Sequence, residues 1–276
     1  QDAKGLLGRM VCAYGPLNKE LMISSFPSAD PQRAFDLAAF RQHHSVVDAI
    51  WGYTQFLVDE TTAKMLTICA RSGLYQWLRM SFGPAPAPAE MQAYVQKTFA
   101  NLRDSDGEEF ASALMDDIKV SSKTFEKHVE HMTLICQAAR KAGFEFKLKK
   151  SQFNQTSIDI WGCICDAEGR RPQAKHLAQL EKWPEPRDSS AVNSFLAFVN
   201  YLWVWLDPTW LKHEATLKPF RKKGCSFSLW HTSPAYKEAF EEIKKSLVKD
   251  CTLHHINFTA AASPEKYWMP LEMFID

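Results

Sequence analysis

Residues 110–122 read FASALMDDIKVSS, and this stretch decides how the rest of the chain is interpreted. Two short apolar runs, 110–114 and 118–122, flank Met115, Asp116 and Asp117. Strand-length runs separated by a few turn residues are typical of two antiparallel strands joined by a tight turn. The stretch therefore predicts a hairpin that carries carboxylates at its tip.

The sequence before and after this hairpin predicts further short elements. Residues 45–50 (SVVDAI) are rich in β-branched side chains and predict a strand that carries Asp48. Apolar residues at helical spacing predict one helix over 87–102 and another over 125–142, which ends at Gly143. The hairpin is thus expected to lie among strands and helices of one domain.

The second half of the chain predicts one more hairpin and then mostly helices. Apolar and polar residues alternate at 144–149 and 158–166, which predicts two paired strands. Beyond Arg171-Pro172, helical stretches are expected at 174–182, 190–205 and 234–248. Alternation near the end, over 267–276, predicts a strand cut off by the end of the chain. These elements together predict an α+β protein with a helical second region.

Composition limits the classes of protein that the chain can be. It has 276 residues, 46% hydrophobic, and a formal net charge of +1, so no global field marks a nucleic-acid or membrane binder. No window reaches the roughly 18 uninterrupted apolar residues that a membrane span needs. Seven cysteines form no disulfide framework, and Cys163 and Cys165 lack the usual zinc spacing. We expect a soluble, intracellular protein with reduced thiols and no membrane partner.

Three acidic residues are the candidates for chemistry. Asp116 and Asp117 lie at the predicted hairpin tip, and Asp48 would join them if its strand is a neighbour. Carboxylates ~4 Å apart repel by roughly 4 kcal/mol at an effective dielectric near 20, so such a cluster needs a cation. Mg²⁺ prefers oxygen ligands, and two such ions support nucleotidyl transfer. The alternative is that Asp116 and Asp117 serve only the turn, which favours Asp for its local hydrogen bonds.

The order of several short motifs resembles the reverse transcriptases of gypsy-type (Metaviridae) long-terminal-repeat retrotransposons, although the match is diverged. Val47-Asp48 with Gly52-Tyr53 is similar to the family's first catalytic-aspartate motif, and Leu114-Met115-Asp116-Asp117 stands where the family has its Y-x-D-D hairpin. The remaining matches are Gly73-Leu74-Tyr75, Met80, Phe82-Gly83, Ala87-Pro88-Ala89, Gln92, His128, His131, Gly143, Lys149-Lys150, Phe153, Trp161-Gly162, Arg171-Pro172, Trp183-Pro184 and Asn200-Tyr201. The resemblance covers nearly the whole chain.

The resemblance implies a right-hand polymerase and an activity. Fingers and an antiparallel-sheet palm would occupy residues 1–170, a helical thumb and connection 171–250, and the truncated start of an RNase H-like region 251–276. Asp276 would be the first acid of that region, which lacks its remaining acids. The implied activity is RNA-directed DNA synthesis, in which deoxynucleotides are added to a primer 3′-hydroxyl with two Mg²⁺ ions, or Mn²⁺ in their place.

The same resemblance assigns roles to individual residues. Asp48, Asp116 and Asp117 would be the catalytic metal ligands, and Tyr53 would be the steric gate against a ribose 2′-hydroxyl. The remaining substrate-binding residues would be Lys4, Arg9, Gln92 and Met115, and the primer and template contacts would be Trp161, Gly162, Lys149 and Lys150. Of these, Gln92, Trp161 and Gly162 are expected to have structural or positioning roles and no part in the chemistry. The implied partners are an RNA or DNA template with its primer, dNTPs, and a homo- or hetero-oligomer or larger assembly. The implied location is the cytoplasm, within a retrotransposon particle, or the nucleus.

Some positions depart from the family pattern and support a second hypothesis. Leu114 replaces the aromatic residue of Y-x-D-D, Ala13 and Gly15 replace a finger ion pair, and Trp203-Val204-Trp205 replaces thumb arginines. Loss of cations weakens phosphate binding. The alternative function is therefore a degenerate or co-opted relative that serves as a non-catalytic binding or structural component of a larger complex.

Overall fold

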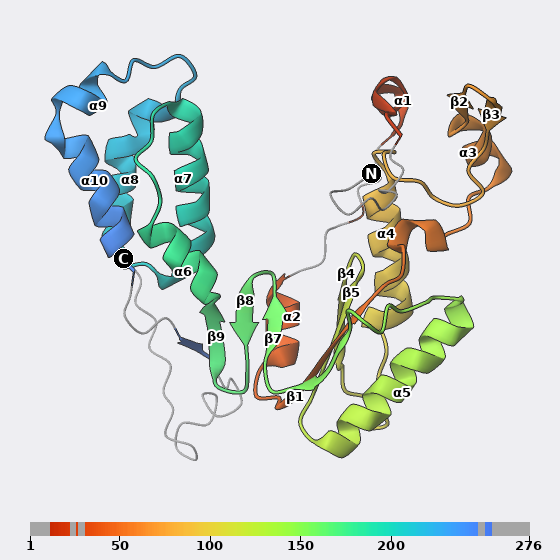
Figure 1. Cartoon of the computed structure of the whole chain (residues 1–276). Coiled ribbons are helices and arrows are strands. Elements are labelled where there is room, and N and C mark those ends of the chain that lie inside the picture. The colour runs from red at the N-terminus through yellow and green to blue at the C-terminus, as the bar shows by residue number, and fades with distance from the viewer. Residues whose placement is uncertain (1–11, 23–25, 27–30, 248–251, 256–276) are drawn as a thin grey trace. The chain divides into compact units, whose positions relative to one another are not determined.

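The computed structural model describes residues 12–22, 26, 31–247 and 252–255, and divides the chain into two compact units, 1–160 and 161–276 (Figure 1). The helices of the first unit are α1 (Gly15–Glu20), α2 (Pro31–Ala38), η1 (Gly52–Gln55), α3 (Glu60–Met65), α4 (Ala87–Val95) with its π-helical extension η2 (Gln96–Ala100), and α5 (Phe125–Ala142). Its strands are β1 (His43–Asp48), β2 (Ile68–Ala70), β3 (Gly73–Tyr75), β4 (Ala111–Leu114), β5 (Asp117–Ser122), β6 (Gln152–Gln155) and β7 (Ile158–Ile160).

The first unit is built on a four-stranded antiparallel sheet of order β4-β5-β1-β6. The predicted hairpin is present, but its turn contains two residues, not three, because Leu114 pairs with Asp117. Met115 takes a left-handed backbone with φ 51°, which is the geometry that a two-residue hairpin turn requires at its first central position. Asp116 therefore lies in the turn, whereas Asp117 begins strand β5.

One face of this sheet forms the core of the unit. Val47 pairs with Ile118, and Val120 lies two residues further along β5 on the same face, all of them buried. Helices α4, η2 and α5 cover this face, and Phe99 and Ile135 are fully buried in the same cluster. Because strand side chains alternate, Asp48 and Asp117 lie on the opposite face from Val47 and Ile118. Burial of the apolar face therefore fixes where the carboxylates point.

A chain of buried hydrogen bonds runs beneath the sheet from α5 to β1. His131 Nε2 lies 3.2 Å from Asp104 Oδ2, and Ser122 Oγ lies 2.8 Å from His131 Nδ1 and 2.7 Å from His128 Nδ1. His128 Nε2 then lies 2.7 Å from Ser45 Oγ, which accepts from the Asn154 N–H. A carboxylate can only accept and an amide N–H can only donate. Asp104 must accept from His131, and each neutral imidazole donates through one nitrogen and accepts through the other. Every hydrogen bond in this chain therefore has its donor on the Asn154 side and its acceptor on the Asp104 side.

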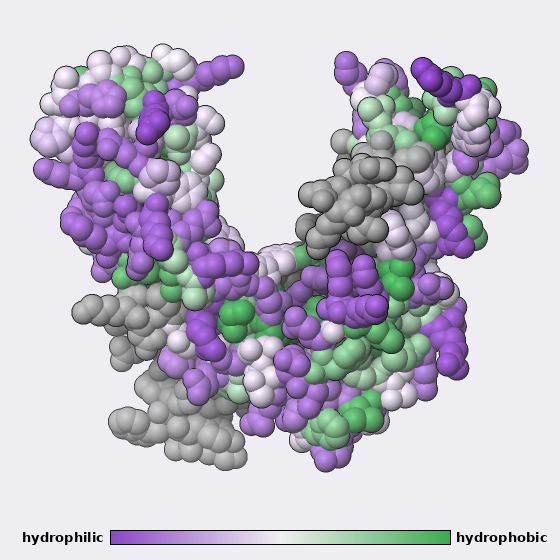
Figure 2. Space-filling view, in the orientation of Figure 1, coloured by the Kyte–Doolittle hydropathy of each residue, from purple (hydrophilic) through white to green (hydrophobic). Residues whose placement is uncertain are grey.

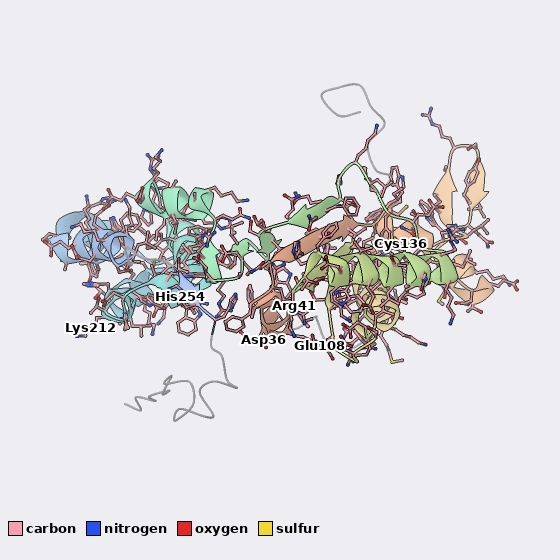
Figure 3. The ribbon with its side chains drawn as sticks, turned by 90° about the horizontal axis from the view of Figure 1, so that it is seen from below. Asp36, Arg41, Glu108, Cys136, Lys212 and His254 are labelled. Atoms are coloured by element: carbon pink, nitrogen blue, oxygen red, sulfur yellow. The ribbon has the colours of Figure 1, made fainter. Side chains whose placement is uncertain are left out.

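Burial disfavours the charged form of both histidines. Burial, followed by the nearby imidazoles, lowers the pKa of His128 to about 4, and burial also lowers the pKa of His131 despite its bond to Asp104. The Arg41 guanidinium, close to this network in sequence and structure, donates to the backbone oxygens of Ser121 and Glu109. Its nearest carboxylate contact with Glu108 is 4.0 Å (Figure 3).

Two expected strands differ in the structure. Residues 144–149 form no strand, because Phe144 and Phe146 turn into the aromatic core around Phe99 and only one isolated bridge joins Phe146 to Ala49. Strand β1 pairs with β5 on one edge and with β6 on the other, and residues 144–149 form no hairpin with 158–166. The expected strand over 158–166 is interrupted at Trp161 and Gly162, which both take positive φ values, so it becomes two short strands.

The second unit is mainly helical, as expected. Its helices are α6 (Ala174–Glu181), α7 (Ser189–Leu202), η3 (Trp203–Trp205), α8 (Trp210–Leu217), η4 (Lys218–Arg221), α9 (Ser228–Thr232) and α10 (Pro234–Lys245), and its strands are β8 (Cys163–Cys165), β9 (Gly169–Pro172) and β10 (Leu253–His254). Helices α8 and α9 were not anticipated. The end strand expected over 267–276, and Asp276 with it, lie outside the described residues.

Tryptophan side chains supply much of the core of the second unit. Trp205, Trp210 and Trp230 are buried, and Trp230 donates to Glu185 across 2.7 Å. Trp203, by contrast, has 57% of its surface exposed. The visible faces of both units carry mainly hydrophilic residues with smaller apolar patches (Figure 2). In the described part of the chain, no helix has the length and apolar character that crossing a bilayer requires.

The pKa of His128 predicts a loss of stability in mild acid. The imidazole binds its proton near pH 6.5 when unfolded but only near pH 4 when folded, so the unfolded state binds more protons between these values. We expect the free energy of unfolding to fall by roughly 2 kcal/mol between pH 7 and pH 4.5 from this residue. Urea unfolding at both pH values measures this fall. His128→Gln should show a smaller fall, whereas the exposed His231→Gln should match the unaltered protein; equal falls in all three would contradict the prediction.

Candidate active site

The β1–β5 register brings the predicted acids together. Asp48 and Asp117 are direct partners across the antiparallel pair, and the Ala49 N–H donates to the Asp116 carbonyl oxygen across 2.9 Å. Directly opposed residues share a face and hold their Cβ atoms about 5 Å apart. Two carboxylates from distant parts of the sequence thus face one another beside the turn that carries the third.

The Gln92 side chain is hydrogen-bonded to the backbone of this hairpin. Its side-chain amide nitrogen donates to the Ala113 carbonyl across 2.9 Å, and its amide oxygen accepts from the Met115 N–H across 2.8 Å. The residue is 2% exposed. The resemblance assigns Gln92 and Met115 to substrate binding, but here the Gln92 amide is committed to the hairpin backbone and to the Met115 N–H. Gln92 therefore acts as a positioning residue, and it supports the left-handed turn at Met115.

The loop after β1 places Gly52 and Tyr53 against the hairpin turn. A Cβ on Gly52 would lie 2.6 Å from Met91 Cε and 3.6 Å from Asp116 Cβ, so a larger residue here would displace the end of the Met91 side chain. Burial, and then the negative charge of Asp116, raise the pKa of Tyr53. The Tyr53 ring packs edge-on against Phe82 with centroids 4.9 Å apart. The predicted gate residue thus has a fixed ring beside the carboxylates.

Two lysines face the carboxylates. Lys119 Nζ lies 3.3 Å from Asp117 Oδ2, and Lys150 Nζ lies 3.8 Å from Asp48 Oδ2. A bound cation is therefore not the sole source of positive charge for these acids, because the two lysines supply part of the compensation. Lys119 was not identified from the sequence. The signal was available, since Lys119 is two residues from Asp117 and so lies on the same strand face.

These residues fit a divalent cation whose remaining ligands come from substrate. Among the described residues, no group of three or more His, Cys, Asp or Glu side chains is gathered as a ready metal site. Mg²⁺ is usually held by one or two carboxylates together with substrate phosphates, not by an all-protein cage. The opposed pair Asp48 and Asp117, with Asp116 next to it, provides a donor set of that kind.

The other predicted site residues are more scattered. Lys4 and Arg9 lie outside the described residues. Lys149 is exposed on the turn before Lys150. Trp161 and Gly162 belong to the second unit, where the Trp161 carbonyl accepts from the Tyr201 hydroxyl across 2.9 Å. A Cβ on Gly162 would overlap that hydroxyl and lie 2.8 Å from His176 Cε1, so this turn requires glycine.

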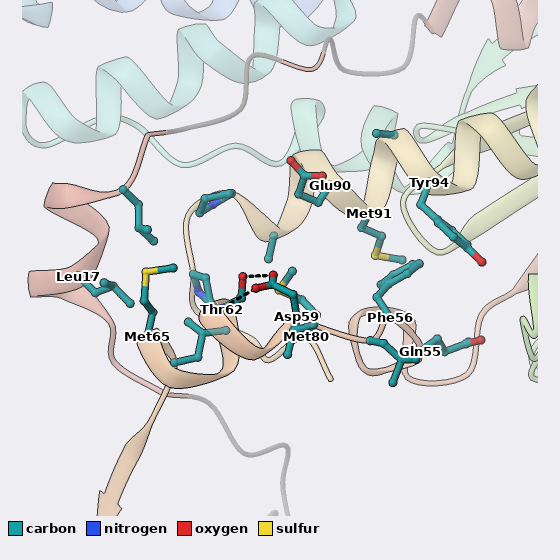
Figure 4. A pocket seen from close by; sticks show the side chains of 18 of the residues that line it. Leu17, Gln55, Phe56, Asp59, Thr62, Met65, Met80, Glu90, Met91 and Tyr94 are labelled. Carbon is teal, nitrogen blue, oxygen red and sulfur yellow. Dashed lines mark hydrogen bonds between the residues drawn. The ribbon is translucent and has the colours of Figure 1, made fainter. Parts of the chain in front are cut away.

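A separate cavity of about 840 Å³ lies in the first unit between α1, α3 and α4 (Figure 4). Its walls are mostly apolar and include Phe56, Met65, Met80 and Met91. None of the three aspartates lines it, so this cavity is distinct from the carboxylate site. It does share Met91 with the loop that carries Gly52.

An antiparallel sheet with opposed carboxylates at a hairpin tip defines the palm of a nucleic-acid polymerase. A sequence model of the reverse transcriptase (RNA-dependent DNA polymerase) family matches residues 22–165, and the chain belongs to this family. Among curated proteins, the Transposon Tf2-3 and Tf2-7 polyproteins of Schizosaccharomyces pombe are each 25% identical over 252 residues, or 91% of this chain. The chain spans 18% of the length of these relatives.

Solved structures have the same fold. The foamy viral protease-reverse transcriptase in complex with double-stranded DNA superposes with a TM-score of 0.71 at 19% identity, covering 86% of this chain and 40% of that one. The same viral protein in complex with an RNA/DNA hybrid gives a TM-score of 0.69 at 18% identity, covering 87% of this chain and 32% of that one. These structures establish the right-hand polymerase fold for this chain.

Replacement of Gln92 tests its positioning role. Gln92→Met keeps the volume but leaves the buried Ala113 carbonyl and the Met115 N–H without their partner. We expect the free energy of unfolding to drop by about 2 kcal/mol, because each unpaired buried group has a desolvation cost. Urea unfolding measures the drop. Gln96→Met, one turn further along the same helical segment, is the matched control and should change stability little; an equal loss in both variants would argue against the role.

Proposed function

We propose that this chain is the fingers, palm and thumb portion of an RNA-directed DNA polymerase from a gypsy-type long-terminal-repeat retrotransposon. The observation that carries this proposal is the pairing of Asp48 with Asp117 beside the Asp116 turn. Family membership and the relation to transposon polyproteins support it. The proposed boundaries are fingers and palm over 1–170, thumb and connection over 171–250, and an RNase H-like start over 251–276.

The proposed chemistry is addition of a deoxynucleotide to a primer 3′-hydroxyl. Asp48, Asp116 and Asp117 would hold two Mg²⁺ ions, or Mn²⁺ in their place. When bound, these ions lower the pKa of the attacking hydroxyl and stabilise the leaving pyrophosphate. The contribution of the protein is positional, since Gln92 fixes the turn and the β1–β5 register fixes the two opposed carboxylates. Tyr53, held against Phe82, would exclude a ribose 2′-hydroxyl by steric clash.

The proposed partners are a template of RNA or DNA with its primer, and dNTPs. Solved relatives of this fold include complexes with DNA and with an RNA/DNA hybrid, which supports nucleic acid as the partner here. Exposed cations such as Lys149, Lys222 and Lys223 are available for phosphate contacts. Lys4, Arg9, Trp161 and Gly162 remain proposed substrate or primer contacts. An intracellular site of action, in a cytoplasmic retrotransposon particle or in the nucleus, and assembly into an oligomer or larger complex are part of the same proposal.

Primer extension on an RNA template with Mg²⁺ and dNTPs tests the polymerase. We expect incorporation by the unaltered chain, and Asp116→Asn should reduce the rate at least a hundredfold, because a metal-binding carboxylate is lost. Asp106→Asn is the matched control, since Asp106 lies in an exposed turn and pairs with Lys127. Absence of incorporation by the folded chain would favour the alternative, a co-opted relative that has lost catalysis. Binding that falls steeply with salt would still indicate a nucleic-acid partner in that case.

Substitution of Tyr53 tests the proposed gate. Tyr53→Val removes the ring while leaving the carboxylates in place, so we expect ribonucleotide incorporation to rise about tenfold or more relative to deoxynucleotide incorporation. The ratio of kcat/KM for a matched rNTP and dNTP measures the effect. Tyr94→Phe alters an aromatic residue that bonds to the Ala142 carbonyl away from the carboxylates, and it should leave the ratio unchanged. An unchanged ratio in Tyr53→Val would remove Tyr53 from the gate role.

A further inference from the structure

Lys119 is a charged residue within the central sheet. Only 8% of its side chain is exposed, although it lies in the middle of β5. A buried ammonium is costly unless it is paired. In the described part of the chain, Asp117 is the only acidic partner of Lys119, with Nζ 3.3 Å from Oδ2. The lysine is therefore held in place by one of the proposed catalytic carboxylates.

The two residues directly opposite Lys119 on the neighbouring strands carry no charge. Val46 lies opposite it on β1 and Ser112 lies opposite it on β4. The Lys119 ammonium lies on the same strand face as Asp117, which is two residues away along β5. Asp117 itself has 45% of its side chain exposed, so it remains accessible to a ligand from solvent.

We propose that Lys119 is a built-in counter-ion for Asp117 that competes with the divalent cation, so that the nucleotide-free site binds the cation weakly. This inference rests on the proposed polymerase function, because it takes Asp117 as a cation ligand. An ammonium 3.3 Å from a carboxylate oxygen already compensates its charge, and it repels an incoming divalent cation. Low accessibility of Lys119 strengthens this repulsion, since fewer water molecules screen it.

The charge balance of the site explains why such competition is useful. Asp48, Asp116 and Asp117 carry three formal negative charges, and Lys119 with Lys150 supplies two positive ones. The metal-free site is thus close to neutral and stable without a cation. A nucleotide triphosphate brings several negative charges, which restore the attraction for a divalent cation. Lys119 therefore makes cation loading depend on the arrival of the nucleotide.

Lys150 contributes less to this effect. Its side chain is 55% exposed and its Nζ lies 3.8 Å from Asp48, so solvent screens the interaction. The described geometry therefore assigns the competition mainly to Lys119.

Direct Mn²⁺ titration of the nucleotide-free chain tests the inference without relying on catalysis. The unbound ion is measured by electron paramagnetic resonance for the unaltered chain and for Lys119→Met. We expect the Kd for Mn²⁺ to fall about tenfold in Lys119→Met, because one nearby positive charge is removed from a site of low accessibility. Lys119→Arg, which keeps the charge, should bind Mn²⁺ as weakly as the unaltered chain. Lys119→Gln is a second neutral variant that should repeat the gain if Lys119→Met does not fold.

A matched control separates this local effect from a change in total charge. Lys123 lies four residues after Lys119, is exposed and pairs with Glu108. Lys123→Met should therefore leave the Kd for Mn²⁺ unchanged. A Kd within twofold of the unaltered chain in both neutral Lys119 variants would overturn the inference, as would an equal gain in Lys123→Met. Asp117→Asn combined with Lys119→Met should lose the gain; retention of it would also overturn the inference. Primer extension by the unaltered chain tests the polymerase and the Mn²⁺ titration tests the counter-ion role. The two measurements are independent, so failure of one proposal can be told from failure of the other.

Discussion

The register between β1 and β5 is the constraint on which the rest of this molecule depends. One pairing scheme buries Val47 against Ile118 and at the same time opposes Asp48 to Asp117 on the other face. Because side chains alternate along a strand, a slip by one residue would turn the carboxylates into the core and the apolar residues out to solvent. The hydrophobic core therefore enforces the geometry of the site, and the two cannot be separated energetically.

Three contacts around the hairpin convert this register into a defined turn. Met115 pays a small conformational cost for its left-handed backbone, and the buried Gln92 side chain bonds to the peptide groups on both sides of it. Gly52 lets the neighbouring loop lie against the Met91 side chain beside Asp116, where a Cβ would come within 2.6 Å of Met91 Cε. On the sheet face opposite the carboxylates, the hydrogen-bonded series from Asp104 through His131 to Ser45 joins α5 to the strands.

The electrostatics of the site are balanced from within the protein. Lys119 and Lys150 each face one of the carboxylates, so the acids do not stand as an isolated negative cluster. The positive charges of these lysines reduce the repulsion between the neighbouring carboxylates. It also distinguishes the two aspartates that follow Met115, because Asp117 has a lysine partner on its own strand whereas Asp116 lies in the turn beside Tyr53.

The sequence alone determined the elements with strong local signals. Helix α5 begins after Thr124, whose side chain caps it, and ends at Gly143 in the left-handed conformation that glycine favours, as the sequence predicted. The strand carrying Asp48 and the hairpin carrying Asp116 and Asp117 were likewise predictable from alternation and turn residues. Residues 144–149 were misassigned because their alternation serves an aromatic cluster around Phe99 and not a sheet.

Only the tertiary structure decided which distant residues meet. The opposition of Asp48 to Asp117 depends on non-local strand pairing, which no local pattern specifies. The bonds of Gln92 to the hairpin join segments 21 and 23 residues apart and so depend on tertiary packing too, whereas the pairing of Lys119 with Asp117 lies within one strand. The sequence thus determined the identity of the acids and the secondary structure that carries them, because both are local properties. Folding decided the spacing of Asp48 from Asp117 and the pairing of Lys150 with Asp48, because these arise from packing between segments that are distant along the chain.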